Sequence, residues 1–137
     1  MKRQPTVADC MATDLLTLPP DMEINRAAAI LLDKGYSGAP VVDAAQRLVG
    51  VLSKKDCLRA ALNTSYYQEW GSPVAAYMST SVVTLDADLG LVQAVEQFLK
   101  SNYRRFPVTR QGRLVGQISR ADLLRAMAEQ WQADRPA

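Results

Sequence analysis

An internal repeat is the feature that most restricts the fold of this chain. Residues 7–60 align with residues 74–126, at an offset of 67 that becomes 66 after a one-residue deletion. The matches include Met11 with Met78, Thr17 with Thr84, Tyr36 with Tyr103, and Pro40-Val41 with Pro107-Val108. A repeat of this length in 137 residues predicts two small units of the same fold, and it leaves no room for a large barrel.

Both copies carry the pattern of an amphipathic first helix. Apolar residues recur at helical spacing over residues 24–31 in the first copy and 91–98 in the second. Each helix has an aspartate before it as a candidate N-cap and a Gly or Asn after it as a candidate left-handed stop. These signals are Asp21 and Gly35 in the first copy, and Asp88 and Asn102 in the second.

Two short β-rich runs separated by a polar turn follow each first helix and predict a hairpin. They cover residues 39–42 and 48–52, then 106–109 and 114–118. A second helix is expected to begin at Ser53 or Ser119 and to direct Leu58 or Leu123-Leu124 toward the core. The predicted class is therefore α+β, with an extended start, a helix, two strands and a helix in each copy.

The repeat divides the chain into a first motif over 7–62, a linker over 63–73, a second motif over 74–128 and a C-terminal tail over 129–137. The linker contains Tyr66, Tyr67 and Trp70 among small polar residues. These aromatic side chains either anchor the connector to the body of the protein or form a partner or gating surface.

The residues that are missing exclude several kinds of chemistry. The chain has no histidine, which removes Ser-His-Asp and Cys-His catalysis and the commonest zinc ligand. Cys10 and Cys57 are far apart, and we expect both to be reduced, half-buried small hydrophobic residues. We therefore expect no enzymatic activity, no metal site and no required cofactor.

Charge and hydropathy argue against nucleic acid and membrane as partners. The 16 basic and 14 acidic residues give a net charge of only +2, too small for a strong field around the protein. No apolar run approaches the roughly 18 residues of a membrane span. We expect a cytoplasmic protein.

One motif is repeated where a strand runs into the second helix: Gly50-x-x-Ser53-x-x-Asp56 and Gly116-x-x-Ser119-x-x-Asp122. Ser-x-x-Asp at a helix start is typical of a capping box. The same helix end could bind phosphate, with the serine as a donor and the aspartate accepting from ribose hydroxyls. Lys54 and Arg120 follow each serine and either add positive charge to that site or face solvent.

Arg104 and Arg105 stand just before a strand of the second copy. Their counterparts in the first copy are Ser37 and Gly38, so the two copies differ here. The guanidinium groups could bind phosphate bidentately, or they could be solvated charges that protect a strand edge from aggregation.

Through the Pro-Val strand and the Gly-x-x-Ser-x-x-Asp ending, residues 7 to about 128 resemble the CBS domain family. The resemblance implies two β-α-β-β-α motifs related by a pseudo-twofold axis, with small sheets packed together and helices outside, a pair often called a Bateman module. It also implies binding of adenosine nucleotides or related adenosyl compounds in two clefts, and pairing into homodimers.

The resemblance also implies roles for individual residues. Thr17 would lie near the base, the Gly38-Ala39-Pro40 backbone around the adenine, Ser53 at phosphate and Asp56 on the ribose. The second cleft would use Thr84, Phe106-Pro107, Ser119 and Asp122. Arg104 and Arg105 match a position from which family members often reach phosphate, sometimes across the pseudo-twofold axis in the other cleft. We therefore expect a stand-alone regulatory module that binds AMP, ADP or ATP and acts on a separate, unidentified protein. The alternative is a ligand-free dimerisation or docking module.

Overall fold

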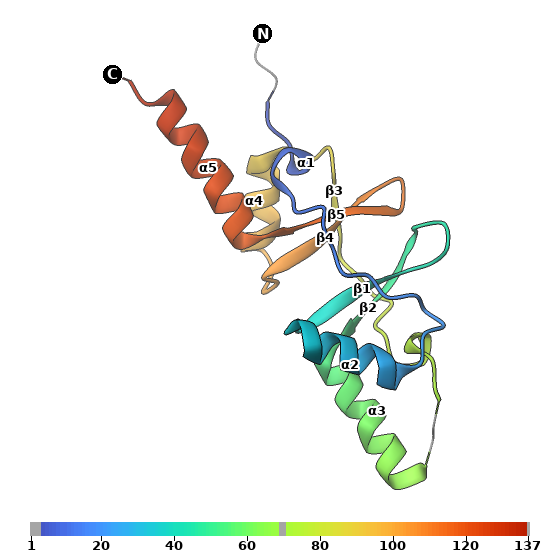
Figure 1. The fold of residues 1–137 in the computed structure, drawn as a ribbon. Helices are drawn as coiled ribbons and strands as arrows, with labels where there is room; N and C mark the ends of the chain where they lie inside the picture. Colours follow the sequence, from blue (N-terminus) through green and yellow to red (C-terminus); the bar gives the residue numbers. More distant parts are fainter. Residues whose placement is uncertain (1–3, 69–70, 137) are drawn as a thin grey trace. The chain divides into compact units, whose positions relative to one another are not determined.

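The computed structural model describes residues 4–68 and 71–136, and the chain divides into two compact units (Figure 1). One unit is continuous and runs from Leu16 to Val82. The other combines the chain before Leu16 with the chain after Val82. Each unit has a hydrophobic core of its own.

The continuous unit consists of a hairpin and two main helices. Its elements are α2 (Ile24–Lys34), β1 (Gly38–Val42), β2 (Leu48–Ser53), α3 (Lys54–Tyr67) and the 3₁₀ turn η1 (Val74–Ala76). β1 and β2 are antiparallel, and Leu18 forms a parallel bridge with Val41. The most deeply buried side chains of this core include Leu18, Leu31, Val41, Leu52 and Val74.

The discontinuous unit repeats this plan with an added strand. Its elements are α1 (Val7–Cys10), β3 (Leu85–Asp86), α4 (Leu91–Leu99), β4 (Arg105–Arg110), β5 (Arg113–Ser119) and α5 (Arg120–Asp134). β3 is parallel to β4, and β4 is antiparallel to β5. Its core is built around Val7, Phe98, Phe106, Val108 and Ile118.

The compact units are offset from the sequence repeats because each unit contains the leading segment of the other repeat. In the discontinuous unit the backbone N–H of Val7 donates to Leu89 at 2.8 Å, and Ala12 exchanges two hydrogen bonds with Gln117. In the continuous unit Ser79 exchanges two hydrogen bonds with Val51. Residues 7–12 and 74–79 are equivalent in the alignment, so the two repeats have exchanged their first segments.

This exchange explains the glycine of the repeated motif. A Cβ atom on Gly50 would lie 2.6 Å from the sulfur of Met78 and 2.8 Å from the carbonyl oxygen of Ser79. A Cβ atom on Gly116 would collide with the sulfur of Met11 and lie 2.8 Å from the carbonyl oxygen of Ala12. Only glycine allows the exchanged segment to approach this closely.

The exchanged segments also correct the predicted helix starts. Asp21 and Asp88 are not N-caps: α2 begins after Glu23 and α4 after Gly90, in both cases without a side-chain cap. The residues just before each helix are hydrogen-bonded to the exchanged segment, as in Val74 N–H to Met22 and Val7 N–H to Leu89. This pairing holds them extended and delays the first helical turn.

One of the two predicted helix ends is confirmed. Gly35 ends α2 in the left-handed conformation, with φ of 71°, as expected. Asn102 was the wrong stop, because α4 ends at Leu99 and is followed by Lys100 in a right-handed conformation. Backbone hydrogen bonds from Lys100 to Glu96 and from Ser101 to Phe98 close this helix end without a left-handed residue.

Both predicted hairpins are confirmed. Each strand of the first hairpin is one residue longer than expected, and each strand of the second is two residues longer. Gln111 and Gly112 both have positive φ, the mark of a two-residue type I′ turn. The expected core positions need one correction: Leu123 is buried, but Leu58 and Leu124 are exposed. Each of these exposed leucines lies on the outer face of its helix.

The second helices run past the boundaries of the repeats. α3 continues through Tyr67 into the predicted linker, and α5 continues to Asp134 through the predicted tail. Tyr66 and Tyr67 are exposed and contact one another, so these two do not anchor the connector to the core. Trp70 lies outside the described residues. Within residues 4–68 and 71–136 no helix is both long and apolar enough to cross a bilayer.

Candidate functional site

The predicted site residues of the first repeat gather at one end of the β1–β2 hairpin. Strand register pairs Gly38 with Ser53 and Ala39 with Leu52. The N–H of Leu18 donates to Pro40 at 3.0 Å, which holds the adjacent Thr17 beside β1. Lys54 and Asp56 follow on the first turn of α3, so the seven residues surround a single strand-to-helix junction.

The second repeat assembles its residues in the same way. Arg105 pairs with Ser119 and Phe106 with Ile118, while the β3–β4 ladder pairs Leu85 with Val108. This ladder holds Thr84 next to Pro107. Arg120 and Asp122 lie on the first turn of α5, and Arg104 directly precedes β4.

Both serine–aspartate pairs form complete capping boxes. Ser53 Oγ accepts from the N–H of Asp56 at 3.1 Å, and Asp56 Oδ2 accepts from the N–H of Ser53 at 2.8 Å. In the second repeat, Ser119 and Asp122 make the same two bonds at 3.1 and 3.0 Å. The capping interpretation of the motif is confirmed.

The capping boxes reduce the number of backbone N–H groups that these helix ends can donate to an anion. Besides the N–H bonded to the serine, the first N–H of each helix is used: Lys54 donates to Ser37 at 2.9 Å and Arg120 to Arg104 at 3.0 Å. These two N–H groups of each helix are therefore not available to a phosphate. Attraction of phosphate at this place depends more on side-chain cations and on the helix dipole.

The junctions of the two repeats carry different exposed cations. Arg104, Arg105 and Arg120 are exposed in the second repeat, whereas Lys54 and Lys55 are exposed on the first turn of α3 in the first repeat. Arg120 Nε donates to the carbonyl of Tyr103 at 3.1 Å, which fixes the guanidinium beside the turn that carries Arg104.

The side chain of Phe106 lies in the hydrophobic core. Its side chain is only 2% exposed and makes edge-to-face contacts with Phe98 and Tyr103, at centroid distances of 4.7 and 5.3 Å. The ring belongs to the core, and only the backbone of Phe106 is available to a base. Ala39 and Pro40 of the first repeat are buried too.

Tyr36 and Tyr103 also lie at the two strand-to-helix junctions, although they were not among the predicted site residues. Both are partly exposed and stand two residues before β1 and β4, at the same junctions as the predicted residues. The signal was present, because the two tyrosines are matched in the internal repeat.

The surroundings of both cysteines disfavour the thiolate form. Burial raises the pKa of the Cys10 thiol, with further contributions from Asp122 and Asp9. Burial and then Asp56 raise the pKa of Cys57 in the same way. Both are free, half-buried thiols, as expected. In the described part of the chain no cluster of His, Cys, Asp or Glu could hold a metal ion.

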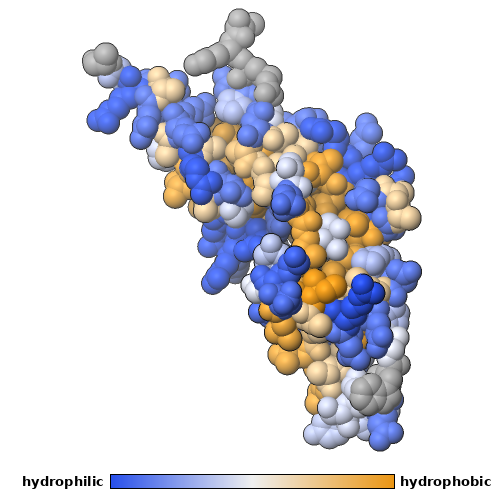
Figure 2. All heavy atoms as spheres, viewed as in Figure 1, coloured by the Kyte–Doolittle hydropathy of each residue, from blue (hydrophilic) through white to orange (hydrophobic). Residues whose placement is uncertain are grey.

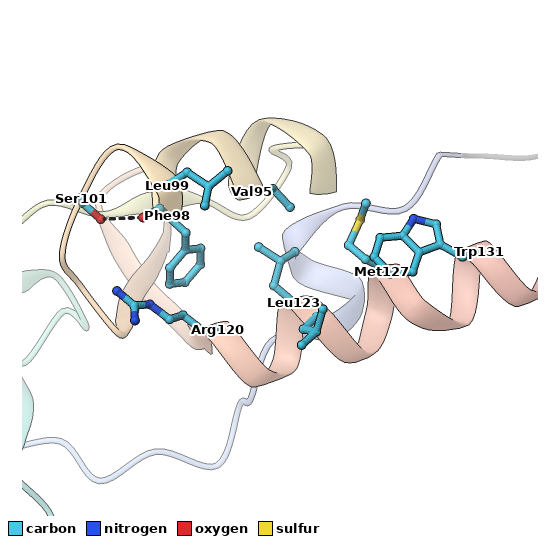
Figure 3. A pocket seen from close by; sticks show the side chains of 9 residues that line it. Val95, Phe98, Leu99, Ser101, Arg120, Leu123, Met127 and Trp131 are labelled. Carbon is cyan, nitrogen blue, oxygen red and sulfur yellow. Dashed lines mark hydrogen bonds between the residues drawn. The ribbon is translucent and has the colours of Figure 1, made fainter.

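A groove of about 500 Å³ lies between α4 and α5 of the second repeat (Figure 3). Its lining is mainly apolar and comprises Val95, Phe98, Leu99, Ser101, Arg120, Leu123, Leu124, Met127 and Trp131. Arg120 is the one residue that this groove shares with the predicted second site. The groove therefore adjoins the strand-to-helix junction at Arg120.

The model of the CBS domain family matches residues 7–63 and again residues 74–129, which is most of the chain. The chain belongs to the CBS domain family. The two matches confirm the tandem CBS pair, and the folds of solved CBS-pair proteins agree with the α+β architecture.

Several relatives are CBS proteins of similar length. The CBS domain-containing protein YhcV of Bacillus subtilis is 30% identical over 118 residues, covering 86% of this chain and 82% of the relative. CBSX2 of Arabidopsis thaliana is 27% identical, with a TM-score of 0.77 and coverage of 97% and 100%. CBSX2 has also been solved in complex with AMP, a structure 29% identical with a TM-score of 0.75, covering 95% of this chain and 98% of that one.

Other relatives are much longer. The chain spans 44% of an uncharacterized Methanocaldococcus jannaschii protein that is 26% identical over 125 residues, or 91% of this chain. It spans 14% of the A-adding tRNA nucleotidyltransferase of Aquifex aeolicus, which is 31% identical over 90% of this chain. CBS pairs of this kind thus occur both in short proteins and within larger enzymes.

Proposed function

We propose that this CBS pair is a regulatory module that binds an adenine nucleotide, AMP, ADP or ATP, and acts on a separate protein. The observation that carries the proposal is the convergence, at each strand-to-helix junction, of a threonine, a strand backbone and a capped serine–aspartate pair. The AMP complex of CBSX2, at 29% identity, supports the same ligand class. The module has no reaction of its own, and the cytoplasmic location stays a prediction.

The chemistry of the junction suits a nucleotide. Strand backbone beside Thr17 or Thr84 offers donors and acceptors to the edge of a base, and a carboxylate can accept from ribose hydroxyls. Arg104, Arg105 and Arg120 supply positive charge for phosphate in the second repeat. For regulation, the nucleotide must bind two states of the module or of its complex with different affinity.

Calorimetric titration of ligand-free protein with AMP, ADP, ATP and S-adenosylmethionine tests the proposal. We expect saturable binding of at least one of the three nucleotides, favoured over S-adenosylmethionine because the arginines attract phosphate. The competing function is a ligand-free docking module. If none of the four compounds binds to protein shown to contain no bound nucleotide, the result would support a docking module and reject the nucleotide sensor.

Homodimer formation is the second part of the proposal, and exposed leucines support it. Leu32 and Leu99 are equivalent in the repeat, as are Leu58 and Leu124, and these four side chains are 62–81% exposed. Figure 2 shows hydrophobic side chains on the surface over α2 and α3, and the groove between α4 and α5 adds Trp131. Apolar surface shared by both repeats favours a partner with the same surface, which a second copy of the chain provides.

Replacing both Leu99 and Leu124 with glutamate is expected to convert a dimer into a monomer, because the dimer would have to bury two unpaired carboxylates per chain. Light scattering during gel filtration measures the mass directly. The control is Val83→Glu, which changes an exposed apolar residue outside these helices and should leave the dimer intact. A wild-type protein that is monomeric at high micromolar concentration would contradict the dimer.

A further inference from the structure

We propose that only the site of the second repeat binds the nucleotide, so that each chain takes up one. This inference rests on the proposed function and concerns the stoichiometry of the same sites. The two repeats match closely in backbone, yet three differences at the strand-to-helix junction all favour the second repeat.

The first difference is the cation at the start of the strand. Arg104 and Arg105 occupy these positions in the second repeat, and Ser37 and Gly38 occupy them in the first. Gly38 cannot be replaced by a cation in the present backbone, since a Cβ atom there would lie 2.7 Å from the carbonyl oxygen of Leu52 and 3.3 Å from Cα of Ser53. A cation equivalent to Arg105 is therefore sterically excluded from the first repeat, and the position equivalent to Arg104 holds the uncharged Ser37.

The second difference is the state of the carboxylate. Asp56 accepts from the N–H of Ser53 through Oδ2 and from the guanidinium of Arg59 through Oδ1. Its side chain is 9% exposed. A ribose hydroxyl would have to displace Arg59 before it could reach this carboxylate. The nearly buried carboxylate of Asp56 would then lose its ion pair with Arg59.

Asp122 is more open than Asp56. Its Oδ2 accepts from the N–H of Ser119, but Arg125 Nη1 stays 3.6 Å from Oδ1, beyond hydrogen-bond distance. Its side chain is 24% exposed. One carboxylate oxygen of Asp122 is thus accessible to a ribose hydroxyl, whereas both oxygens of Asp56 have partners.

The third difference is the residue that follows the serine. The guanidinium of Arg120 is held by its hydrogen bond to the carbonyl of Tyr103, next to Arg104. A cation that is already oriented loses less side-chain entropy when it binds phosphate. The second repeat therefore combines three arginines with an accessible carboxylate.

A matched pair of isosteric variants tests the inference, with AMP as the probe in calorimetry and equilibrium dialysis. Asparagine keeps an oxygen that can cap the helix, so Asp122→Asn and Asp56→Asn should both fold. We expect one AMP per wild-type chain, and roughly a 10- to 100-fold loss of affinity in Asp122→Asn as a charge-assisted hydrogen bond is lost. Asp56→Asn should change the affinity by less than about twofold, because the ribose never reaches Asp56.

Variants of the exposed arginines provide a second test, because these side chains take no part in the capping box. Arg104→Ser combined with Arg105→Ser should also weaken AMP binding at least about tenfold. Arg113→Ser removes an exposed arginine at the opposite end of β5, and it should bind AMP as the wild type does.

The outcomes separate this inference from the proposed function. Two AMP molecules per chain, or a loss of binding in Asp56→Asn with none in Asp122→Asn, would overturn the single-site inference and leave the nucleotide sensor standing. Unchanged affinity in the double arginine variant would also overturn it. Absence of saturable nucleotide binding to the wild type would reject the proposed function itself.

Discussion

Replacing Phe106 with alanine is expected to lower the free energy of unfolding by about 3–5 kcal/mol, the largest single loss that we anticipate in this chain. The ring is 2% exposed and is enclosed by Phe98 and Tyr103, so its removal leaves a cavity and two aromatic contacts without a partner. Urea denaturation followed by circular dichroism measures this loss.

A conservative variant separates packing from ligand contact at this position. Phe106→Leu keeps much of the apolar volume and should cost clearly less than Phe106→Ala. If the ring lies in the core, folded Phe106→Leu protein should bind nucleotide about as well as the wild type. A drop of less than 1 kcal/mol for Phe106→Ala would contradict the buried position of the ring.

Gly116→Ala is the second change with a large expected effect, a loss of about 1–3 kcal/mol from overpacking. Replacing glycine with alanine normally stabilises the folded state by about 0.4–1 kcal/mol, because it reduces the conformational entropy of the unfolded chain. Here the added methyl group meets the backbone carbonyl of Ala12 at 2.8 Å, which cannot move without breaking the hydrogen bonds to Gln117. The sign of the effect is therefore reversed.

The repeat supplies both a replicate and a control for this measurement. Gly50→Ala should show a similar loss, since its methyl group meets the carbonyl of Ser79. In Gly90→Ala the obstacle is the end of the flexible Gln93 side chain, which can rotate away at little cost. Equal stability of Gly116→Ala and Gly90→Ala would show that the exchanged segment does not pack tightly on β5.

Most of the secondary structure could be predicted from local patterns, because the deciding interactions are local. The Ser53 and Ser119 capping boxes, the Gly35 helix end and the Gln111-Gly112 turn each depend on residues only a few positions apart. The predicted caps at Asp21 and Asp88 were wrong because pairing with the exchanged segments, a long-range interaction, sets the start of both helices.

The exchange itself could not be predicted from one sequence. Met11 and Met78 are equivalent in the repeat, and so are Gly116 and Gly50. Met11 packs against Gly116, and Met78 packs against Gly50. The pattern is therefore compatible with a leading segment that packs on its own repeat or on the other one. The exposure of Leu58 and Leu124 was missed for a related reason, since helical spacing alone does not tell which apolar residue faces the core.

For the candidate site, the repeat identified the two equivalent junctions, but not the burial and the partners of each side chain. Asp56 and Asp122 occupy the same place in the repeat and differ in burial and in their arginine neighbours only in three dimensions. The resemblance to the CBS family assigned Phe106 to the second cleft, but it did not show that the ring packs in the core.

The exchange of leading segments affects the order in which the chain can fold during its synthesis. The continuous unit is complete once Val82 has left the ribosome, so its core can close early. The segment that contains α1 is made before the rest of its unit and has to wait for β5 and α5. At translation rates of about 5–20 residues per second, that delay is on the order of 5–25 seconds. During that time Val7 and Met11 lack their final partners and are exposed to chaperones or to a neighbouring chain.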